Sequence, residues 1–235
     1  MITKNDAVGA EARLSWLLAG VAGMIGAAAF LDSQGYFVTF MTGNTERAVL
    51  QGFSITSARG VVGPTALNVG VLIIAFVTGV AIAMYLRRRF WTNHPHGATV
   101  LATAGLFAAA LTDVALNGFR ENSVTYYPIV IIAFSVGALN AAFVKNGEVS
   151  IPLSYVTGTL VKMGQGIERH ARGGGTVYDW LMYALLYAAF AIGAAAGGVI
   201  GTIIGDGYIL FGAALLCGTT TVVTFFYADR KTVLG

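Results

Sequence analysis

The stretch Phe40-Met41-Thr42-Gly43-Asn44-Thr45-Glu46-Arg47 decides how this chain is expected to fold, because a second copy follows about 115 residues later as Tyr155-Val156-Thr157-Gly158-Thr159-Leu160-Val161-Lys162. Both copies read aromatic, apolar, Thr, Gly, three residues and then a cation. Each follows a short apolar segment that is rich in small residues. A polar element that is duplicated inside an apolar chain is typical of a membrane transporter built from two internal repeats.

The composition is that of an integral membrane protein. Hydrophobic residues make up 56% of the 235 residues and charged residues 11%, whereas a soluble domain carries about 25% charged residues. The length allows one compact bundle without a separate soluble domain. The net charge of +3 gives no indication of nucleic-acid binding. The single cysteine, Cys217, lies in an apolar run, so we expect neither an intramolecular disulfide nor a cysteine metal site.

Six apolar runs can cross a bilayer, which takes about 20 residues of helix. The predicted spans are 14–31, 65–86, 98–117, 127–144, 181–204 and 208–227. They divide three and three, and because three is odd, the second half enters the membrane from the opposite side. The sequence therefore predicts an all-α membrane protein of two inverted repeats, about 14–117 and 127–227, related by a pseudo-two-fold axis in the membrane plane.

The positions of Lys and Arg predict the orientation of the chain. With the N-terminus in the cytoplasm, 11 of the 14 basic residues fall in inner segments, and the exceptions are Arg47, Arg59 and Arg120. Both termini are therefore expected to be cytoplasmic. The run 87–89, three consecutive arginines at the end of the second span, is the clearest anchor. In this orientation the first Thr-Gly element faces outward and the second faces inward.

The segments 33–64 and 145–179 are long for connections in a compact domain. In each, a moderately apolar stretch is followed by Thr-Gly and then by a helix-like piece. We interpret each as a broken or re-entrant helix after spans one and four, since non-helical backbone at membrane depth must be buried in protein or line a watery cavity. The rival interpretation, two further full spans, would place the three arginines outside and is disfavoured.

The Thr-Gly elements form the predicted solute site. The threonine hydroxyls are expected to cap the helices that follow, and the glycines to let backbone or ligand approach closely. A helix N-terminus aimed into a cavity carries partial positive charge, which suits an anionic or polar solute. The predicted binding residues are Thr42, Gly43, Asn44, Arg47, Asn140, Thr157, Gly158 and Lys162. The alternative stays open that Thr-Gly is a helix-packing notch and the cations are interface anchors.

Several other polar residues lie in or near the spans. Asn140 in the fourth span either hydrogen-bonds across helices or binds solute. Asp113 and Asp32 are candidates for proton coupling, because acids inside spans are usually functional; both fall near outer helix ends, where they are alternatively just solvated. Asp32 is expected to pair with Arg47 across the outer mouth, which Asn68 also lines.

Small residues on two spans predict close helix contacts. Gly193, Gly197, Gly201 and Gly205 follow one another at four-residue spacing in span five. Ala75, Gly79 and Ala83 repeat the spacing in span two. We expect both strips to serve packing, within the protomer or in a dimer.

The chain lacks the motifs of the common enzyme and metal-site classes. His94, His96 and His170 fall in cytoplasmic segments without a cysteine or acid cluster, so no metal is expected. There is no phosphate-binding loop, Gly-x-Ser-x-Gly or His-Glu-x-x-His motif. We therefore expect no cofactor and no enzymatic activity.

The stretches 37–45, 137–141 and 155–160 resemble the YoaK-like family of bacterial inner-membrane proteins, whose function is not assigned. The resemblance covers nearly the whole chain and implies six spans in the bacterial inner (plasma) membrane. Family members commonly have an acid in the first span near the position of Gly26, which weakens any mechanism that needs a carboxylate there. A more distant similarity, to half of a major facilitator transporter, implies that two copies assemble into a twelve-helix carrier.

The sequence thus predicts a small secondary transporter of a polar or anionic solute, embedded in the lipid bilayer as a homodimer. Its site lies between the repeats, and one repeat moves against the other. The alternatives are a channel-like pore for a small neutral solute and a non-transporting membrane scaffold or accessory protein.

Overall fold

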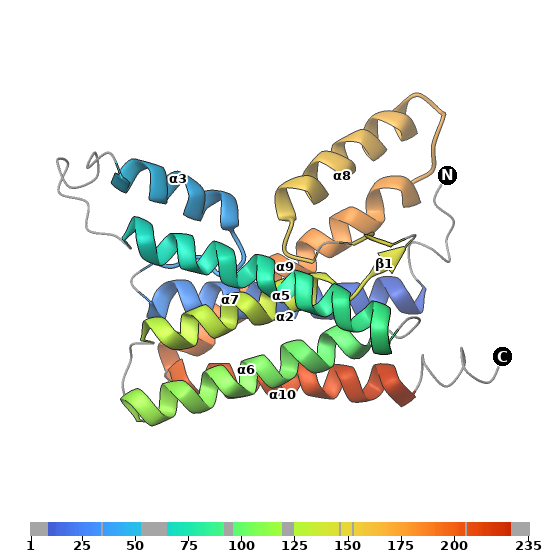
Figure 1. Cartoon of the computed structure of the whole chain (residues 1–235). Coiled ribbons are helices and arrows are strands. Elements are labelled where there is room, and N and C mark those ends of the chain that lie inside the picture. The colour runs from blue at the N-terminus through green and yellow to red at the C-terminus, as the bar shows by residue number, and fades with distance from the viewer. Residues whose placement is uncertain are drawn as a thin grey trace.

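The computed structural model describes residues 9–33, 35–52, 65–91, 96–118, 125–145, 147–151, 153–204 and 206–226, and this part of the chain is almost entirely helical (Figure 1). The elements are α2 (Ala10–Asp32), α3 (Met41–Gly52), α5 (Ala66–Phe90), α6 (His96–Asn117), α7 (Tyr126–Asn140), β1 (Val144–Lys145), β2 (Glu148–Val149), α8 (Val156–Ala171), α9 (Tyr178–Ile204) and α10 (Asp206–Thr224).

Six apolar helices coincide with the six predicted spans. Four of them, α2, α5, α6 and α9, contain stretches of 21 to 25 residues that are long and apolar enough to cross a membrane. The helix α7 has 15 residues and ends at Asn140, before the predicted end at Val144. It is shorter because Val144 belongs to β1 instead. Together the helices make this the fold of a helical membrane protein, with α7 and α10 as its shorter apolar members.

Local sequence signals set both ends of α5. At its start, Thr65 Oγ1 accepts a hydrogen bond of 3.3 Å from the backbone N–H of Asn68, which satisfies one free amide of the first turn. At its end, the arginines 87–89 occupy the last turn, where cations interact favourably with the helix dipole. Arg87 Nη1 also donates to Ala142 O at 3.1 Å, so the end of α5 is joined to the chain that follows α7.

The helices pack in a regular set of pairs. In the bundle, α2 lies along α9, and α5 lies along α7. The helix α6 packs on α7, and α10 packs on α2. The short helix α3 packs on α5, and the short helix α8 packs on α9. The helices α6 and α10 also contact each other. Figure 1 shows that α2 begins and α10 ends at the same end of the bundle. The buried core between these pairs includes Leu18, Ile25, Leu72, Ile129 and Leu139.

Glycines bring α2 and α9 into backbone contact. A Cβ added to Gly23 would lie 2.1 Å from Phe190 O, and one added to Gly193 would lie 2.0 Å from Gly20 O. Gly197 meets α2 in the same way one turn further on. The predicted packing role of the span-five strip is therefore confirmed for its first two members, while Gly205 lies outside the described residues.

The same kind of crossing joins α5 and α7. A Cβ added to Gly79 would lie 2.0 Å from Phe134 O, and one added to Gly137 would lie 2.2 Å from Phe76 O. Ala83, one turn beyond Gly79, is buried. The packing role predicted for the small residues of span two is confirmed at these positions.

The chain doubles back before α3 and again before α8. Thr39, just before α3, packs against α2 so closely that a Cβ on Gly26 would lie 2.6 Å from Thr39 Oγ1. Ser154, just before α8, donates its backbone N–H to Asn140 Oδ1 at 2.9 Å. Both short helices lie on one side of the bundle, and their first turns lie near its middle in the view of Figure 1. The extended part of each long segment thus returns along the preceding helix, and the short helix that follows packs on α5 or α9.

A small β-hairpin between α7 and α8 departs from the purely helical prediction. Val144 pairs with Val149 and Lys145 with Glu148 in antiparallel register. Gly147 in the turn has φ of 82°, a conformation that glycine adopts without strain. The sequence signal was the dipeptide Asn-Gly at 146–147, which favours a two-residue hairpin turn.

Candidate functional site

The two Thr-Gly elements form the first turns of α3 and α8. The helices begin at equivalent residues of the two copies, Met41 and Val156. Thr42 and Thr157 are therefore the second helical residues, and both are exposed. The prediction that they cap the helices is wrong, because the N-cap position of α8 is taken by Tyr155, which makes no side-chain cap bond.

An aromatic ring covers the glycine in each element. A Cβ on Gly43 would lie 2.2 Å from Phe40 Cδ1, and one on Gly158 would lie 1.9 Å from Tyr155 Cε1. Both glycines are buried beneath the ring that stands three residues earlier. Glycine is needed here so that the ring can pack on the helix backbone.

Asn44 is fully buried and is occupied by the returning chain. Its Nδ2 donates to Phe37 O at 2.6 Å, and its Oδ1 accepts from Phe37 N at 3.3 Å. Nδ2 also lies 3.6 Å from Met41 Sδ. The amide therefore fixes the extended segment before α3, and its predicted part in solute binding stays a prediction.

Asn140 has the corresponding role before α8. It is 7% exposed, and its Nδ2 donates to Val136 O and to Ser154 Oγ, both at 2.8 Å. Its Oδ1 accepts from Ser154 N. The partner predicted on another helix is thus the extended segment that leads into α8. Both Nδ2 protons and one Oδ1 lone pair are used there, and the alternative role of Asn140 as a solute ligand stays a prediction.

The guanidinium of Arg47 is held by the chain that leads into its own helix. Its Nη1 donates to Gly35 O. Its Cζ lies 4.5 Å from the centroid of the Phe37 ring and 5.7 Å from that of Phe30, within cation–π range. The predicted pairing with Asp32 falls on a side chain outside the described part of the structure.

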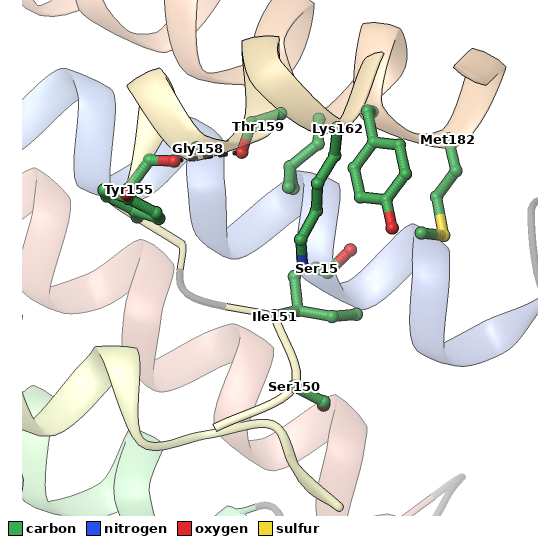
Figure 2. A pocket seen from close by; sticks show the side chains of 10 residues that line it. Ser15, Ser150, Ile151, Tyr155, Gly158, Thr159, Lys162 and Met182 are labelled. Carbon is green, nitrogen blue, oxygen red and sulfur yellow. Dashed lines mark hydrogen bonds between the residues drawn. The ribbon is translucent and has the colours of Figure 1, made fainter. Parts of the chain in front are cut away.

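Lys162, the counterpart of Arg47, has a different setting. Its side chain is exposed but lies on the face of α8 toward α9, with Nζ 5.7 Å from the centroid of the Tyr183 ring. It lines a cavity of ≈ 30 Å³ together with Ser15 of α2 and Ser150 before α8. Figure 2 shows the Lys162 side chain directed away from its helix toward Ser15. Of the predicted binding residues, Lys162 and Gly158 line this cavity.

Two tyrosines that the sequence analysis missed surround Asn68. Asn68 Nδ2 donates to Tyr36 OH at 2.9 Å, and Tyr126 OH donates to Asn68 O at 2.8 Å. The two tyrosine rings lie 5.6 Å apart between centroids. Their position at the ends of apolar runs was the available signal, since tyrosine gathers at membrane interfaces.

Asp113 is 2% exposed on α6, so the alternative that it is simply solvated is wrong. Its predicted part in proton coupling stays a prediction. Cys217 is buried, with Sγ 3.9 Å from Thr99 O. Within the described ranges, no group of three or more His, Cys, Asp or Glu side chains is placed to hold a metal ion.

Comparison with known proteins gives one family. Residues 14–223 match the family described as "Protein of unknown function (DUF1275)". The chain belongs to this family. It is also similar to a UPF0700 transmembrane protein of Rhizobium meliloti (strain 1021), with 31% identity over 189 residues that cover 80% of this chain and 74% of the relative. No solved structure matches. Membership, the transmembrane relative and the apolar helices identify a multi-pass membrane protein of a family without an assigned function.

Proposed function

We propose that this protein is a small secondary transporter of a polar or anionic solute. In this proposal it consists of two inverted three-span repeats, about 14–117 and 127–227, and works as a homodimer in the bacterial inner membrane with cytoplasmic termini. The observation that carries the proposal is that the helix crossings of the two halves correspond residue by residue.

The correspondence is closest where backbones touch. Each half contains a Phe-x-x-Gly segment, at 76–79 or 190–193. The carbonyl of the phenylalanine contacts a glycine of the partner helix, and the glycine of the segment contacts a backbone carbonyl of the same partner helix. The residues that correspond, 114 positions apart, are Gly20 and Phe134, Gly23 and Gly137, Phe76 and Phe190, and Gly79 and Gly193. Independent packing of two unrelated halves would give no reason for one constant separation.

The helix pairs follow the same rule. Let α2, α3, α5 and α6 of the first half correspond, in this order, to α7, α8, α9 and α10 of the second half. The pair α2–α9 then corresponds to the pair α7–α5, and the pair α3–α5 corresponds to the pair α8–α9. The pair α6–α7 then corresponds to α10–α2, while α6–α10 corresponds to itself. A two-fold operation that exchanges the halves produces this pattern. Inverted repeats of this kind are the usual architecture of secondary transporters, with discontinuous helices around the solute site.

The solute-facing groups in this proposal are those that the fold leaves exposed. Asn44 and Asn140 hold the returning segments, so the hydroxyls of Thr42 and Thr157 and the ammonium of Lys162 are left to meet a solute. Movement of one repeat against the other would alternate access to the first turns of α3 and α8. The homodimer rests on analogy with carriers in which two six-helix halves, each a pair of inverted repeats, form one unit.

The test begins with a screen of metabolites for thermal stabilisation of the purified protein, because a ligand that prefers the folded state raises its stability. A hit is then assayed for saturable uptake and counterflow in proteoliposomes. The near-isosteric changes Thr42→Val and Thr157→Val are expected to raise the KM for uptake. Thr219→Val, at an exposed site on α10, is the matched control and should leave it unchanged.

The outcomes separate the alternatives. Linear flux without counterflow would identify a pore and contradict the carrier. Absence of any flux for a solute that binds would favour a scaffold or accessory protein. Equal kinetics in the wild type and both threonine variants would overturn the location of the site while leaving transport itself intact.

A further inference from the structure

The cavity beside Lys162 is shaped for one small group. It lies where the start of α8 faces α2 and α9, and its volume is ≈ 30 Å³. About 10–15 Å³ suffices for one water molecule on this measure, so the space admits a group of only a few heavy atoms. Figure 2 shows the Lys162 side chain reaching between Ile151 and Ser15 into this space.

The lining of the cavity is positive and rich in hydroxyl groups. Ser15, Ser150, Thr159 and Tyr183 contribute hydroxyls, and Lys162 contributes the one charge. None of the ten lining residues, all of them within the described part of the chain, is Asp or Glu. Ser15 is 1% exposed, so the end of the cavity at α2 is screened from solvent. An ammonium without a lining carboxylate, in a site partly shielded from water, favours an anion.

The corresponding place in the first half is filled. Arg47, the counterpart of Lys162, donates to Gly35 O, whereas Gly35's own counterpart, Ser150, lines the open cavity. Ile151 also lines the cavity, whereas its counterpart Tyr36 accepts a hydrogen bond from Asn68. One half of the molecule thus closes over its cation with protein groups, and the other half leaves its cation beside an open space.

We infer that the cavity lined by Lys162, Ser15, Ser150 and Tyr183 is a subsite for one compact monovalent anionic group, either a halide or the carboxylate of a small organic solute. The inference rests on the proposed transport function, of which it names the solute class and the inward-facing contact. The ammonium supplies the charge, and the hydroxyls of Ser150 and Tyr183 supply hydrogen bonds to the anion. Ser15 Oγ closes the end of the cavity and donates its proton to Ala12 O at 2.8 Å. A divalent oxyanion is excluded, because one cation in so small a space leaves its second charge uncompensated.

Binding is measured on the full chain in detergent, in a buffer whose only anion is a bulky sulfonate. Thermal unfolding is followed while sodium chloride, sodium acetate or sodium sulfate is added at equal ionic strength. Chloride binding is read directly from the ³⁵Cl NMR line width, with acetate as the competitor. The variants are Lys162→Gln, which removes the charge and leaves a neutral polar side chain one atom shorter, and Lys145→Gln, a control at an exposed lysine of the hairpin.

Chloride, acetate or both should stabilise the wild type, and sulfate should not. In Lys162→Gln the apparent affinity should fall about ten- to a hundredfold, as expected from the loss of one charge-assisted hydrogen bond. Lys145→Gln should behave like the wild type. A response to acetate alone assigns the group to an organic carboxylate, and a response to chloride alone assigns it to a free halide.

Equal responses in the wild type and Lys162→Gln would overturn the subsite and leave Lys162 as an interface anchor. No response to any anion would mean that the cavity holds water. Anion binding without flux of that anion or its parent solute would contradict transport and leave the subsite standing. Flux without a response to any of the anions would contradict the subsite and leave transport standing.

Discussion

Two buried asparagines hold the chain segments that lead into α3 and α8. Asn44 binds both backbone groups of Phe37, and Asn140 binds the backbone and the hydroxyl of Ser154. Leaving such a buried group unpaired costs about 1–3 kcal/mol, so each amide strongly fixes the path of non-helical backbone. At the residue scale, then, the amides serve the fold, and the neighbouring exposed threonines are free to serve a solute.

The ring-over-glycine contact gives a prediction at the same scale. Gly158→Ala should destabilise the protein by about 1–3 kcal/mol, because the new Cβ would lie 1.9 Å from the Tyr155 ring and would force it away. Adding Tyr155→Ala should recover most of this loss, since the clash then has no partner. Unfolding midpoints of the two single variants and the double variant measure the coupling.

A control is available on the same helix. A Cβ on Gly164 would meet nothing within 4 Å, so Gly164→Ala should stabilise α8 by up to about 1 kcal/mol through helix propensity. A Gly158→Ala variant as stable as Gly164→Ala, or a double variant without recovery, would show that the ring does not determine the need for glycine.

At the scale of elements, α8 is attached to the bundle along a narrow strip. Its buried residues are Gly158, Thr159 and Gly166, while most of its other side chains are exposed. Gly166 lets it approach the start of α9, since a Cβ there would lie 2.5 Å from Asp179 O. An element with few buried apolar contacts belongs to the less stable parts of a protein, from which moving parts are drawn. In the proposed transport cycle, α8 would be the helix that changes position.

The glycine crossings give the prediction at this scale. Gly79→Ala and Gly193→Ala should both destabilise the protein, by about 3 kcal/mol or more, because each new Cβ would lie 2.0 Å from a backbone carbonyl that cannot rotate away. If the two crossings are equivalent, the losses in unfolding free energy should agree within about 1 kcal/mol.

Each helix carries its own control. Gly70→Ala in α5 meets nothing within 4 Å, and Gly198→Ala in α9 meets Leu31 Cδ1 at an ordinary 3.9 Å. Both should be tolerated. A large loss at Gly79 with none at Gly193, measured by thermal unfolding in detergent, would argue against equivalent crossings and therefore against the repeat.

Elements that are set by local sequence patterns could be predicted, whereas contacts that form only in the folded chain could not. The long apolar runs and the small-residue strips were readable from the sequence, because span length and glycine spacing are local patterns. The hairpin at 144–149 was missed because its strands have two residues each and give no periodic signal. The contacts of Asn44 and Arg47 were not predicted, because their partners, Phe37 and Gly35, come within reach only when the chain doubles back.

At the scale of the whole molecule, the two halves differ in how they hold their cations. Arg47 is closed over by Gly35 and two phenylalanine rings, and Lys162 stands beside a cavity. Two inverted repeats in the same conformation would treat their cations alike. In the proposed mechanism, this difference is the asymmetry that alternating access requires: one side is closed while the other is open.

The proposed inverted arrangement predicts that α3 and α8 are reached from opposite sides of the membrane. Glu46 on α3 and Gln165 on α8 are both exposed, so Glu46→Cys and Gln165→Cys introduce thiols at accessible sites. An impermeant maleimide should label Glu46→Cys in right-side-out vesicles and Gln165→Cys in inside-out vesicles. The wild type is the background control, because its free cysteine, Cys217, is 0% exposed and should stay unlabelled until the protein unfolds. Labelling of both variants from the same side would contradict the inverted topology, and with it the reading of α3 and α8 as two re-entrant elements that face opposite compartments.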